Sequence, residues 1–180
     1  RWLDNSYTLL GKARLYMGEW DDAVEAFRYV FANGKDENDK NEALTWLMRA
    51  YIDRKDYTNA LNVAEYLRVQ PLTKETTRDY YLAKAYLHQQ RQEYLLAVAI
   101  LEESLPLMKK SAAKSRIHYV MGQLYDELGK YELANKQYYK ADNNKASYDL
   151  GFFARLNALQ NKVILNPKMD LTSIGFGRML

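Results

Sequence analysis

The sequence has 180 residues, 48% of them apolar and 27% charged, and its formal net charge is +3. This length suits one domain with a sizeable core, and so small a net charge does not indicate nucleic acid as a partner. The absence of cysteine excludes disulfides, thiolate metal sites and cysteine nucleophiles. No apolar run approaches the roughly 18 residues that a membrane-spanning helix needs, so no transmembrane segment is expected.

The amino-acid usage favours helices. Val, Ile and Thr are scarce while Leu and Ala are common, which argues against a sheet protein. Tyrosine is in excess, with 16 residues. The expected fold class is therefore all-α.

Four segments, taken in chain order, share an aromatic residue three positions before an alanine. They span 18–27, 55–64, 91–101 and 129–138. Their alanines follow one another at steps of 37 residues and are Ala23, Ala60, Ala97 and Ala134. Upstream of each alanine lies an apolar stretch with helical spacing, at 7–16, 44–52, 80–87 and 118–129. The pattern predicts four helical hairpins, and residues 148–162 predict a ninth helix.

This pattern resembles the tetratricopeptide repeat, whose first helix carries a large residue, Leu-Gly and Tyr, and whose second helix carries Ala and an aromatic residue. In the last repeat the family positions hold Met121, Gly122, Tyr125, Gly129, Tyr131, Ala134, Tyr138 and Ala141. Other repeats depart from the signature at Arg14, Met48, Ala64 and Leu101. The resemblance implies an all-α, right-handed superhelix of four helical hairpins plus a terminal capping helix.

The expected domain is one tetratricopeptide solenoid over residues 1–162. Its repeats span approximately 4–35, 41–73, 76–108 and 115–146, and the capping helix spans 148–162. Residues 163–180 read as a tail or as the start of a truncated segment, because the helical pattern fails from Asn166-Pro167 onward. Small residues at Gly11, Ala83 and Gly122 are expected to let paired helices approach closely.

The sequence offers little that could carry catalysis. His88 and His118 each stand alone on a predicted helix, so we expect surface or interface roles rather than ligation or acid–base chemistry. Asp21 and Asp22 begin a second helix, where carboxylates complement the amide dipole. We therefore expect no enzyme, no catalytic residue, no metal and no cofactor.

In tetratricopeptide proteins the first helix of each hairpin lines a concave groove, and positions five and nine of the repeat point into it. The register places there Thr8 and Lys12, Thr45 and Arg49, Tyr80 and Lys84, and Tyr119 and Gln123. Three cations beside two tyrosines favour a protein or peptide partner that is acidic, with Arg49 able to make a bidentate contact to a carboxylate. The alternative is that these cations are solvated and balanced by Glu42, Asp53 and Asp126. No ninth position is Asn, so binding of chaperone C-terminal tails is not expected.

A closer resemblance begins at Trp2-Leu3-Asp4-Asn5-Ser6-Tyr7 and continues through the first repeats. It is similar to the large tetratricopeptide lipoproteins of Bacteroidota known as PorW or SprE, which are associated with type IX secretion and gliding motility. The resemblance implies a lipoprotein at the periplasmic face of the outer membrane that binds an envelope-spanning secretion component. A cytoplasmic location, an adaptor unrelated to secretion, and a spacer that packs against further repeats of a longer chain stay open as alternatives.

Overall fold

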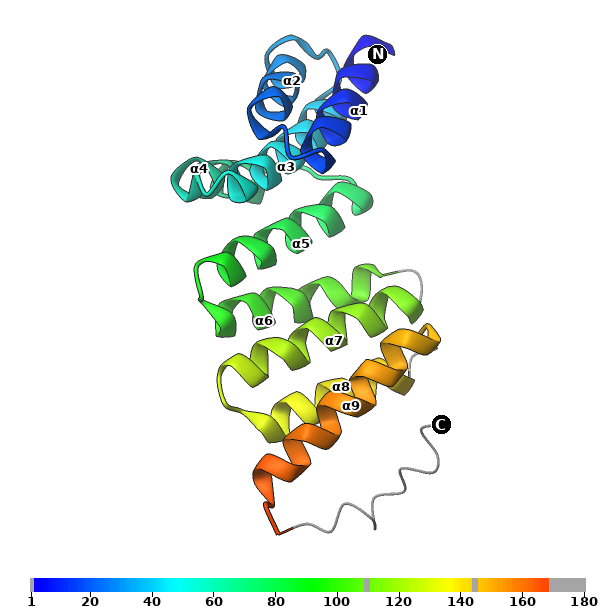
Figure 1. The fold of residues 1–180 in the computed structure, drawn as a ribbon. Helices are drawn as coiled ribbons and strands as arrows, with labels where there is room; N and C mark the ends of the chain where they lie inside the picture. The colour runs from blue at the N-terminus through cyan, green and yellow to red at the C-terminus, as the bar shows by residue number, and fades with distance from the viewer. Residues whose placement is uncertain (1, 109–110, 144–145, 169–180) are drawn as a thin grey trace. The chain divides into compact units, whose positions relative to one another are not determined.

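The computed structural model describes residues 2–108, 111–143 and 146–168, which form α-helices and one short 3₁₀ turn (Figure 1). No strand occurs within these ranges. The chain divides into two compact units, Arg1–Leu107 and Met108–Leu180. Among the described helices none is both long and apolar enough to cross a membrane.

Unit 1 contains three helical hairpins that follow one another along the chain. Their helices are α1 (Trp2–Tyr16) with α2 (Trp20–Asn33), α3 (Glu37–Asp53) with α4 (Tyr57–Arg68), and α5 (Lys74–Gln90) with α6 (Tyr94–Ser104). The 3₁₀ turn Leu105–Leu107 follows α6. The two helices of each hairpin pack against each other, and α3 also packs against α1, α2 and α5.

Every hairpin turn has the same backbone form. One residue in each turn adopts a left-handed conformation, with φ between 60° and 79°, at Gly18, Lys55, Gln92 and Gly129. The residue that follows donates its backbone N–H to the carbonyl five positions earlier, as Asp56 does to Tyr51 and Lys130 to Tyr125. This is the Schellman ending of a helix. The four left-handed residues are 37 positions apart, so the sequence repeat is also a backbone repeat.

The repeating alanines mark the closest contacts inside the hairpins. Ala23, Ala60, Ala97 and Ala134 are all fully buried, as their position in the pattern predicted. A Cβ atom on Gly11 would lie 2.6 Å from the Phe27 ring, and one on Gly122 would lie 2.6 Å from the Tyr138 ring. The expectation that small residues allow close approach is confirmed at these two glycines.

Unit 2 contains α7 (Ser111–Glu127), α8 (Tyr131–Asn143) and α9 (Tyr148–Leu165). The helix α9 packs mainly on α8, where Ala154 and Ala158 meet Ala134, Tyr138 and Ala141. The Asp126 carboxylate on α7 accepts hydrogen bonds from Tyr138 on α8 and from Asn161 on α9. One acidic side chain thus links all three helices. Burial of the Tyr138 ring, together with the hydrogen bond to Asp126, raises the pKa of Tyr138.

The observed fold class agrees with the sequence prediction: the described chain is all-α, with successive antiparallel helices. The ninth helix is longer than expected, because it continues through residues 163–165 before Asn166 caps it. The predicted tail therefore starts later than residue 163, and its part from 169 to 180 lies outside the described residues.

Candidate functional site

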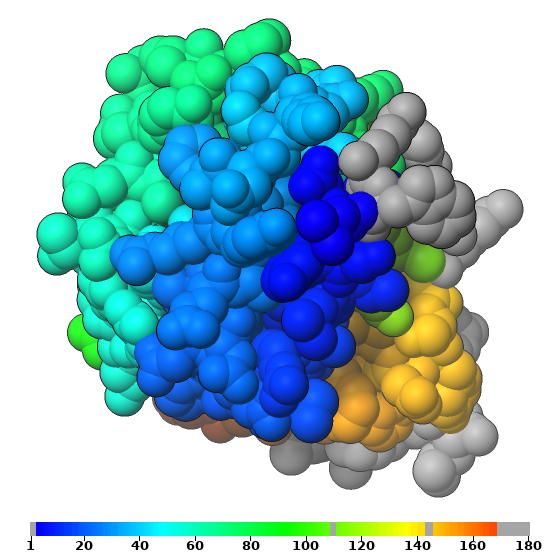
Figure 2. Space-filling view, turned by 90° about the horizontal axis from the view of Figure 1, so that it is seen from above, coloured from blue at the N-terminus to red at the C-terminus, as the bar shows by residue number. Residues whose placement is uncertain are grey.

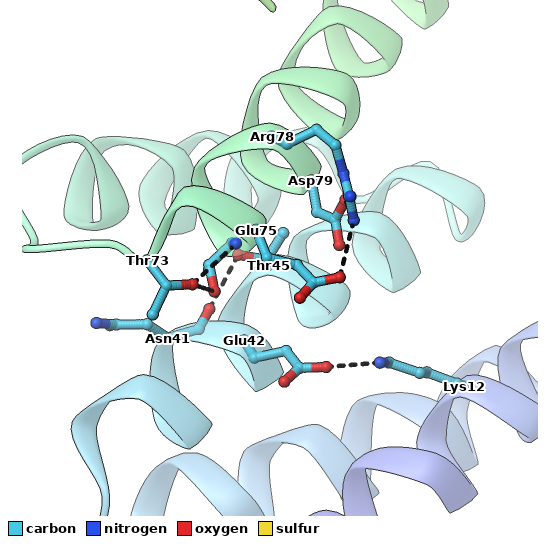
Figure 3. Close-up of polar contacts among 9 residues, drawn as sticks. Lys12, Asn41, Glu42, Thr45, Thr73, Glu75, Arg78 and Asp79 are labelled. Carbon is cyan, nitrogen blue, oxygen red and sulfur yellow. Dashed lines mark hydrogen bonds and ion pairs between the residues drawn. The ribbon is translucent and has the colours of Figure 1, made fainter. Parts of the chain in front are cut away.

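The first helices of the three hairpins in unit 1 form a continuous surface. Because α3 packs against both α1 and α5, side chains from all three helices meet around it. We call this the first-helix surface and define it by Lys12 on α1, by Glu42, Trp46 and Arg49 on α3, and by Asp79 and Tyr86 on α5. Figure 3 shows its polar end, where Lys12, Glu42 and Asp79 come from three different helices.

Each predicted cation of unit 1 lies over an aromatic ring. Lys12 Nζ lies 4.7 Å from the centre of the Trp46 ring. The Arg49 guanidinium lies 3.9 Å from the centre of the Tyr86 ring. Lys84 Nζ lies 5.7 Å from the centre of the Tyr80 ring. Such contacts attract a cation to the ring face and restrict its side chain.

Two of these cations are also ion-paired. Lys12 Nζ donates to Glu42 at 2.6 Å, and Arg49 Nε donates to Asp53 at 3.0 Å. The alternative drawn from the sequence, that nearby carboxylates balance the cations, holds for the pairs Lys12–Glu42 and Arg49–Asp53. The third carboxylate named there, Asp126, instead serves the helix contacts of unit 2.

Two clefts open on the first-helix surface. The larger, of about 280 Å³, has one cation, Lys12, and four carboxylates in its lining, which are Asp39, Glu42, Glu75 and Asp79. Burial raises the pKa of Asp79, although its contact with Arg78, at 2.7 Å, and the nearby Lys12 act in the opposite direction. This end of the surface is therefore acidic, contrary to the simple row of cations that the register suggested.

The smaller cleft, of about 170 Å³, lies between α3 and α5 and is more apolar. Its lining consists of Thr45, Trp46 and Arg49 of α3 and of Asp79, Leu82 and Ala83 of α5. The third hairpin carries two extra residues within 88–94, so the residues of α5 before this insertion align with α3 at a step of 35. Asp79 thus occupies the repeat position that Leu44 holds in the preceding hairpin. Because a carboxylate keeps contact with water where a leucine would be buried, this substitution favours an open cleft at that point.

The predicted fifth positions do not face solvent in unit 1. Thr8 and Thr45 are buried, and Thr45 donates its hydroxyl to the carbonyl of Asn41 within α3. Tyr80 is 5% exposed and donates its hydroxyl to the carbonyl of Ala64 on α4. All three residues are buried in the packing, so the structure corrects the placement of Thr8 and Tyr80 in an open groove, whereas Thr45 still lies in the lining of the smaller cleft.

Tyr119 and Gln123 lie on α7 and so belong to unit 2. Tyr119 is half-buried against Tyr138, and its hydroxyl accepts a hydrogen bond from Asn157 on α9. Gln123 is exposed.

The histidines have ordinary partners. His88 Nδ1 lies 2.6 Å from Glu93 Oε2 across the turn between α5 and α6. His118 Nδ1 lies 2.9 Å from Gln137 Oε1 between α7 and α8. No cluster of three or more His, Asp or Glu side chains suited to a metal occurs in the described part of the chain.

Sequence reasoning missed Trp46, Tyr86 and Asp79 as members of the surface. One signal was present, since Trp46 precedes Arg49 by three residues and therefore shares its helix face. The contacts of Lys12 with Trp46 and of Arg49 with Tyr86 join different hairpins, however, and no spacing within one helix indicates them.

The chain is similar to solved structures of other proteins. The crystal structure of MamA protein matches with a TM-score of 0.58 and 18% identity, over 94% of this chain and 97% of that one. A thermophilic tetratricopeptide repeat protein of Thermus thermophilus matches with a TM-score of 0.46 and 22% identity, over 87% of this chain and 99% of that one. No protein-family model matches the chain, and neither does any curated protein.

The repeating hairpins, their buried alanines and the similarity to MamA together define the class of fold. It is the all-α fold of tetratricopeptide repeat proteins.

Proposed function

We propose that the chain is a non-enzymatic scaffold that binds a protein partner on the first-helix surface of unit 1. The observation that supports this proposal is the set of contacts that the Arg49 side chain makes. Its guanidinium lies over the Tyr86 ring, and it pairs with the Asp53 carboxylate through Nε. Its two terminal nitrogens can hold a carboxylate in a bidentate contact, which supports a role in binding at the smaller cleft.

The cleft beside Arg49 supports a second feature of the proposed partner. Trp46, Leu82 and Ala83 offer an apolar wall next to the guanidinium. A segment with a carboxylate adjacent to one large apolar side chain would satisfy both features. Because the helices that carry these groups are already fixed by hairpin packing, the partner alone would have to become ordered.

The test uses short displayed peptides selected on the 180-residue chain and then synthesised for fluorescence anisotropy. We expect the selected peptides to carry Asp or Glu next to a large apolar residue. Arg49→Glu should weaken binding by about tenfold or more, since a hydrogen bond to a charged group contributes about 1.5–3 kcal/mol.

The matched control is Arg68→Glu, which reverses an exposed arginine on α4 that also pairs with a carboxylate, Glu65. This variant should bind the peptides with unchanged affinity. Equal losses in both variants would indicate a non-specific charge effect, and no loss with Arg49→Glu would exclude this surface.

We further infer, from the resemblance of residues 2–7 and the segments after them, a role in secretion or gliding as part of a lipoprotein at the periplasmic face of the outer membrane. The support is the sequence resemblance alone. Crosslinking of the full-length protein in its native envelope, through Lys84, should capture an envelope component of the secretion system. Recovery of the protein in the cytoplasmic fraction would instead favour an adaptor unrelated to secretion.

A further inference from the structure

The outer side of the first hairpin carries an uncovered apolar ridge. Leu3, Tyr7 and Leu10 recur on α1 at i, i+4 and i+7, and Leu3 and Leu10 are 55% and 45% exposed. Tyr29 of α2 stacks on Tyr7, with ring centres 4.2 Å apart. Figure 2 looks onto this side, where α1 and α2 lie next to each other at the surface.

The second hairpin shows what normally covers this ridge. A step of 37 residues takes Tyr7, Leu10 and Arg14 to three residues of α3, which are Leu44, Leu47 and Tyr51. All three are at most 4% exposed. The Tyr51 hydroxyl accepts a hydrogen bond from Arg28 of α2, so this ridge of α3 faces α2. The ridge of the second hairpin is thus covered by α2, the second helix of the preceding hairpin.

A neighbouring pair of alanines supports the same comparison. Ala50 on α3 is fully buried, whereas its equivalent on α1, Ala13, is exposed. The first helix of each of these two hairpins packs against its own second helix and against the following hairpin. Only the second hairpin also packs against a preceding hairpin within the described residues. Where a preceding hairpin would pack on the first, a cleft of about 320 Å³ opens between Tyr7 and Leu10 of α1 and Ala26 and Tyr29 of α2.

We propose that this outer side of α1 and α2 is a stacking surface for the second helix of a further tetratricopeptide-type hairpin of the same polypeptide, packed as α2 packs on α3. This inference concerns a different surface from that of the proposed function. It assigns the exposed apolar residues of the first hairpin to the solenoid and leaves the first-helix surface to the partner.

The departures of the first repeat specify the helix that would fit. Arg14 stands where α3 has Tyr51, and it already pairs with Glu19 and lies 3.6 Å from Asp22. A cation such as Arg28 would repel it, so the covering helix needs an acceptor at that position. Met17 is the equivalent of Arg54, which pairs with Asp21 of α2 at 2.7 Å. The covering helix therefore needs an apolar residue, instead of a carboxylate, at the position equivalent to Asp21.

The first experiment uses the absence of native cysteines, which makes an introduced thiol a unique reporter. Ala13→Cys and Ala50→Cys are prepared separately in the 180-residue chain, and circular dichroism checks that both fold. We expect Cys at position 13 to react with a thiol reagent at least about tenfold faster than Cys at position 50, which reacts only after local opening. Equal, slow rates would show that the chain itself covers the ridge and would overturn the proposal.

The second experiment restores the missing neighbour. A copy of residues 1–37 is joined in front of the Ala13→Cys chain, which preserves the 37-residue step. In the copy, Arg28→Glu and Asp21→Leu supply the acceptor and the apolar residue. We expect labelling at position 13 to slow by about tenfold or more, and to slow less with an unaltered copy. An unchanged rate with both copies would contradict stacking on this surface.

The third experiment identifies the source of the covering helix in the natural full-length protein. A photo-crosslinking amino acid replaces Leu10, and mass spectrometry locates the product. The proposal expects a crosslink within the same polypeptide to a segment that precedes the first hairpin. A crosslink only to another polypeptide, or none in the folded protein, would overturn it.

Discussion

At the scale of single residues, the contact between the two helices of a hairpin conserves volume rather than residue type. In the first and last repeats a glycine meets a large ring, as Gly11 meets Phe27 and Gly122 meets Tyr138. The equivalent pair in the second repeat is Met48 with Ala64, and both residues are buried. The large side chain has moved from the second helix to the first, so the two departures from the family signature compensate each other.

This compensation predicts strong coupling between residues 48 and 64. Ala64→Phe alone should overpack the hairpin and cost about 1–3 kcal/mol of unfolding free energy. Met48→Gly alone should leave a cavity and cost about 2–5 kcal/mol. The double variant recreates the pair found in the first repeat. Its loss of unfolding free energy should be smaller than the sum of the two single losses by at least about 1 kcal/mol. Urea unfolding measures all three, and simple additivity would refute the pairing.

A second residue-scale prediction concerns pH. The Asp56 carboxylate caps the N-terminus of α4 and accepts hydrogen bonds from the backbone and side chain of Asn59. The Asn59 side chain and Arg54 hold the pKa of Asp56 below its ordinary value. A lowered folded-state pKa stabilises the fold above the unfolded-state pKa, and this contribution is lost as pH falls through the folded-state value.

Asp56→Ala should therefore cost about 1 kcal/mol at neutral pH, as the loss of a helix cap usually does. The difference in unfolding free energy between this variant and the unaltered chain should become smaller as pH falls below about 4. Thermal unfolding at several pH values measures this, with Glu25→Ala on the exposed side of α2 as the control. A difference that is constant with pH would assign the effect to packing instead of charge.

At the scale of elements, the hairpin turns show how one backbone form is built from different residues. Glycine fills the left-handed position in the first and fourth turns, but Lys55 and Gln92 fill it in the second and third. A side chain in this conformation costs about 1–2 kcal/mol relative to glycine. The turns persist because the helices on both sides are held by packing along their whole length.

Lys55→Gly and Gln92→Gly should consequently each stabilise unit 1, by about 0.5–1 kcal/mol, once the greater freedom of glycine in the unfolded chain is subtracted. Gly129→Ala should destabilise unit 2 by a similar amount. Apart from its own chain neighbours, no group lies within 4 Å of the place where its Cβ would stand, so the backbone conformation alone would cause the loss. The melting temperatures of the three variants are compared with that of the unaltered chain. A lower melting temperature for Lys55→Gly or Gln92→Gly would contradict this account of the turns.

At the scale of the whole molecule, the chain consists of two units with separate cores. The core cluster of unit 1 runs from Leu15 to Leu87, and that of unit 2 runs from Ala134 to Ala158. Because a solenoid is stabilised mainly by contacts between neighbouring hairpins, a unit that keeps its own neighbours keeps most of its stability.

Residues 1–107 alone should therefore fold, with a helical circular dichroism spectrum and cooperative thermal unfolding. They should also bind the selected peptides as the full chain does, since the first-helix surface lies in unit 1. The control is residues 1–73, which lack Tyr80 and Leu87 of the core cluster and should melt at a lower temperature. An unfolded 1–107 fragment would show that its stability depends on unit 2.

The sequence alone predicted what depends on neighbours along the chain. Helix positions, hairpin turns and the four buried alanines follow from apolar spacing and small residues, which act within one helix or between two consecutive helices. The end of α9 was less predictable, because several residues after Lys162 can still continue a helix.

Tertiary structure decided which groups meet across hairpins. Lys12 and Glu42 are 30 positions apart, and Arg49 and Tyr86 are 37 apart, so only the packing of α1, α3 and α5 places a ring beneath each cation and a carboxylate beside Lys12. The same packing buried Thr45 and Tyr80, which the register alone had placed in a groove. The sequence by itself determined the repeating hairpin, since that unit is local. The tertiary structure determined the surface, since charge balance and exposure depend on every helix that comes near.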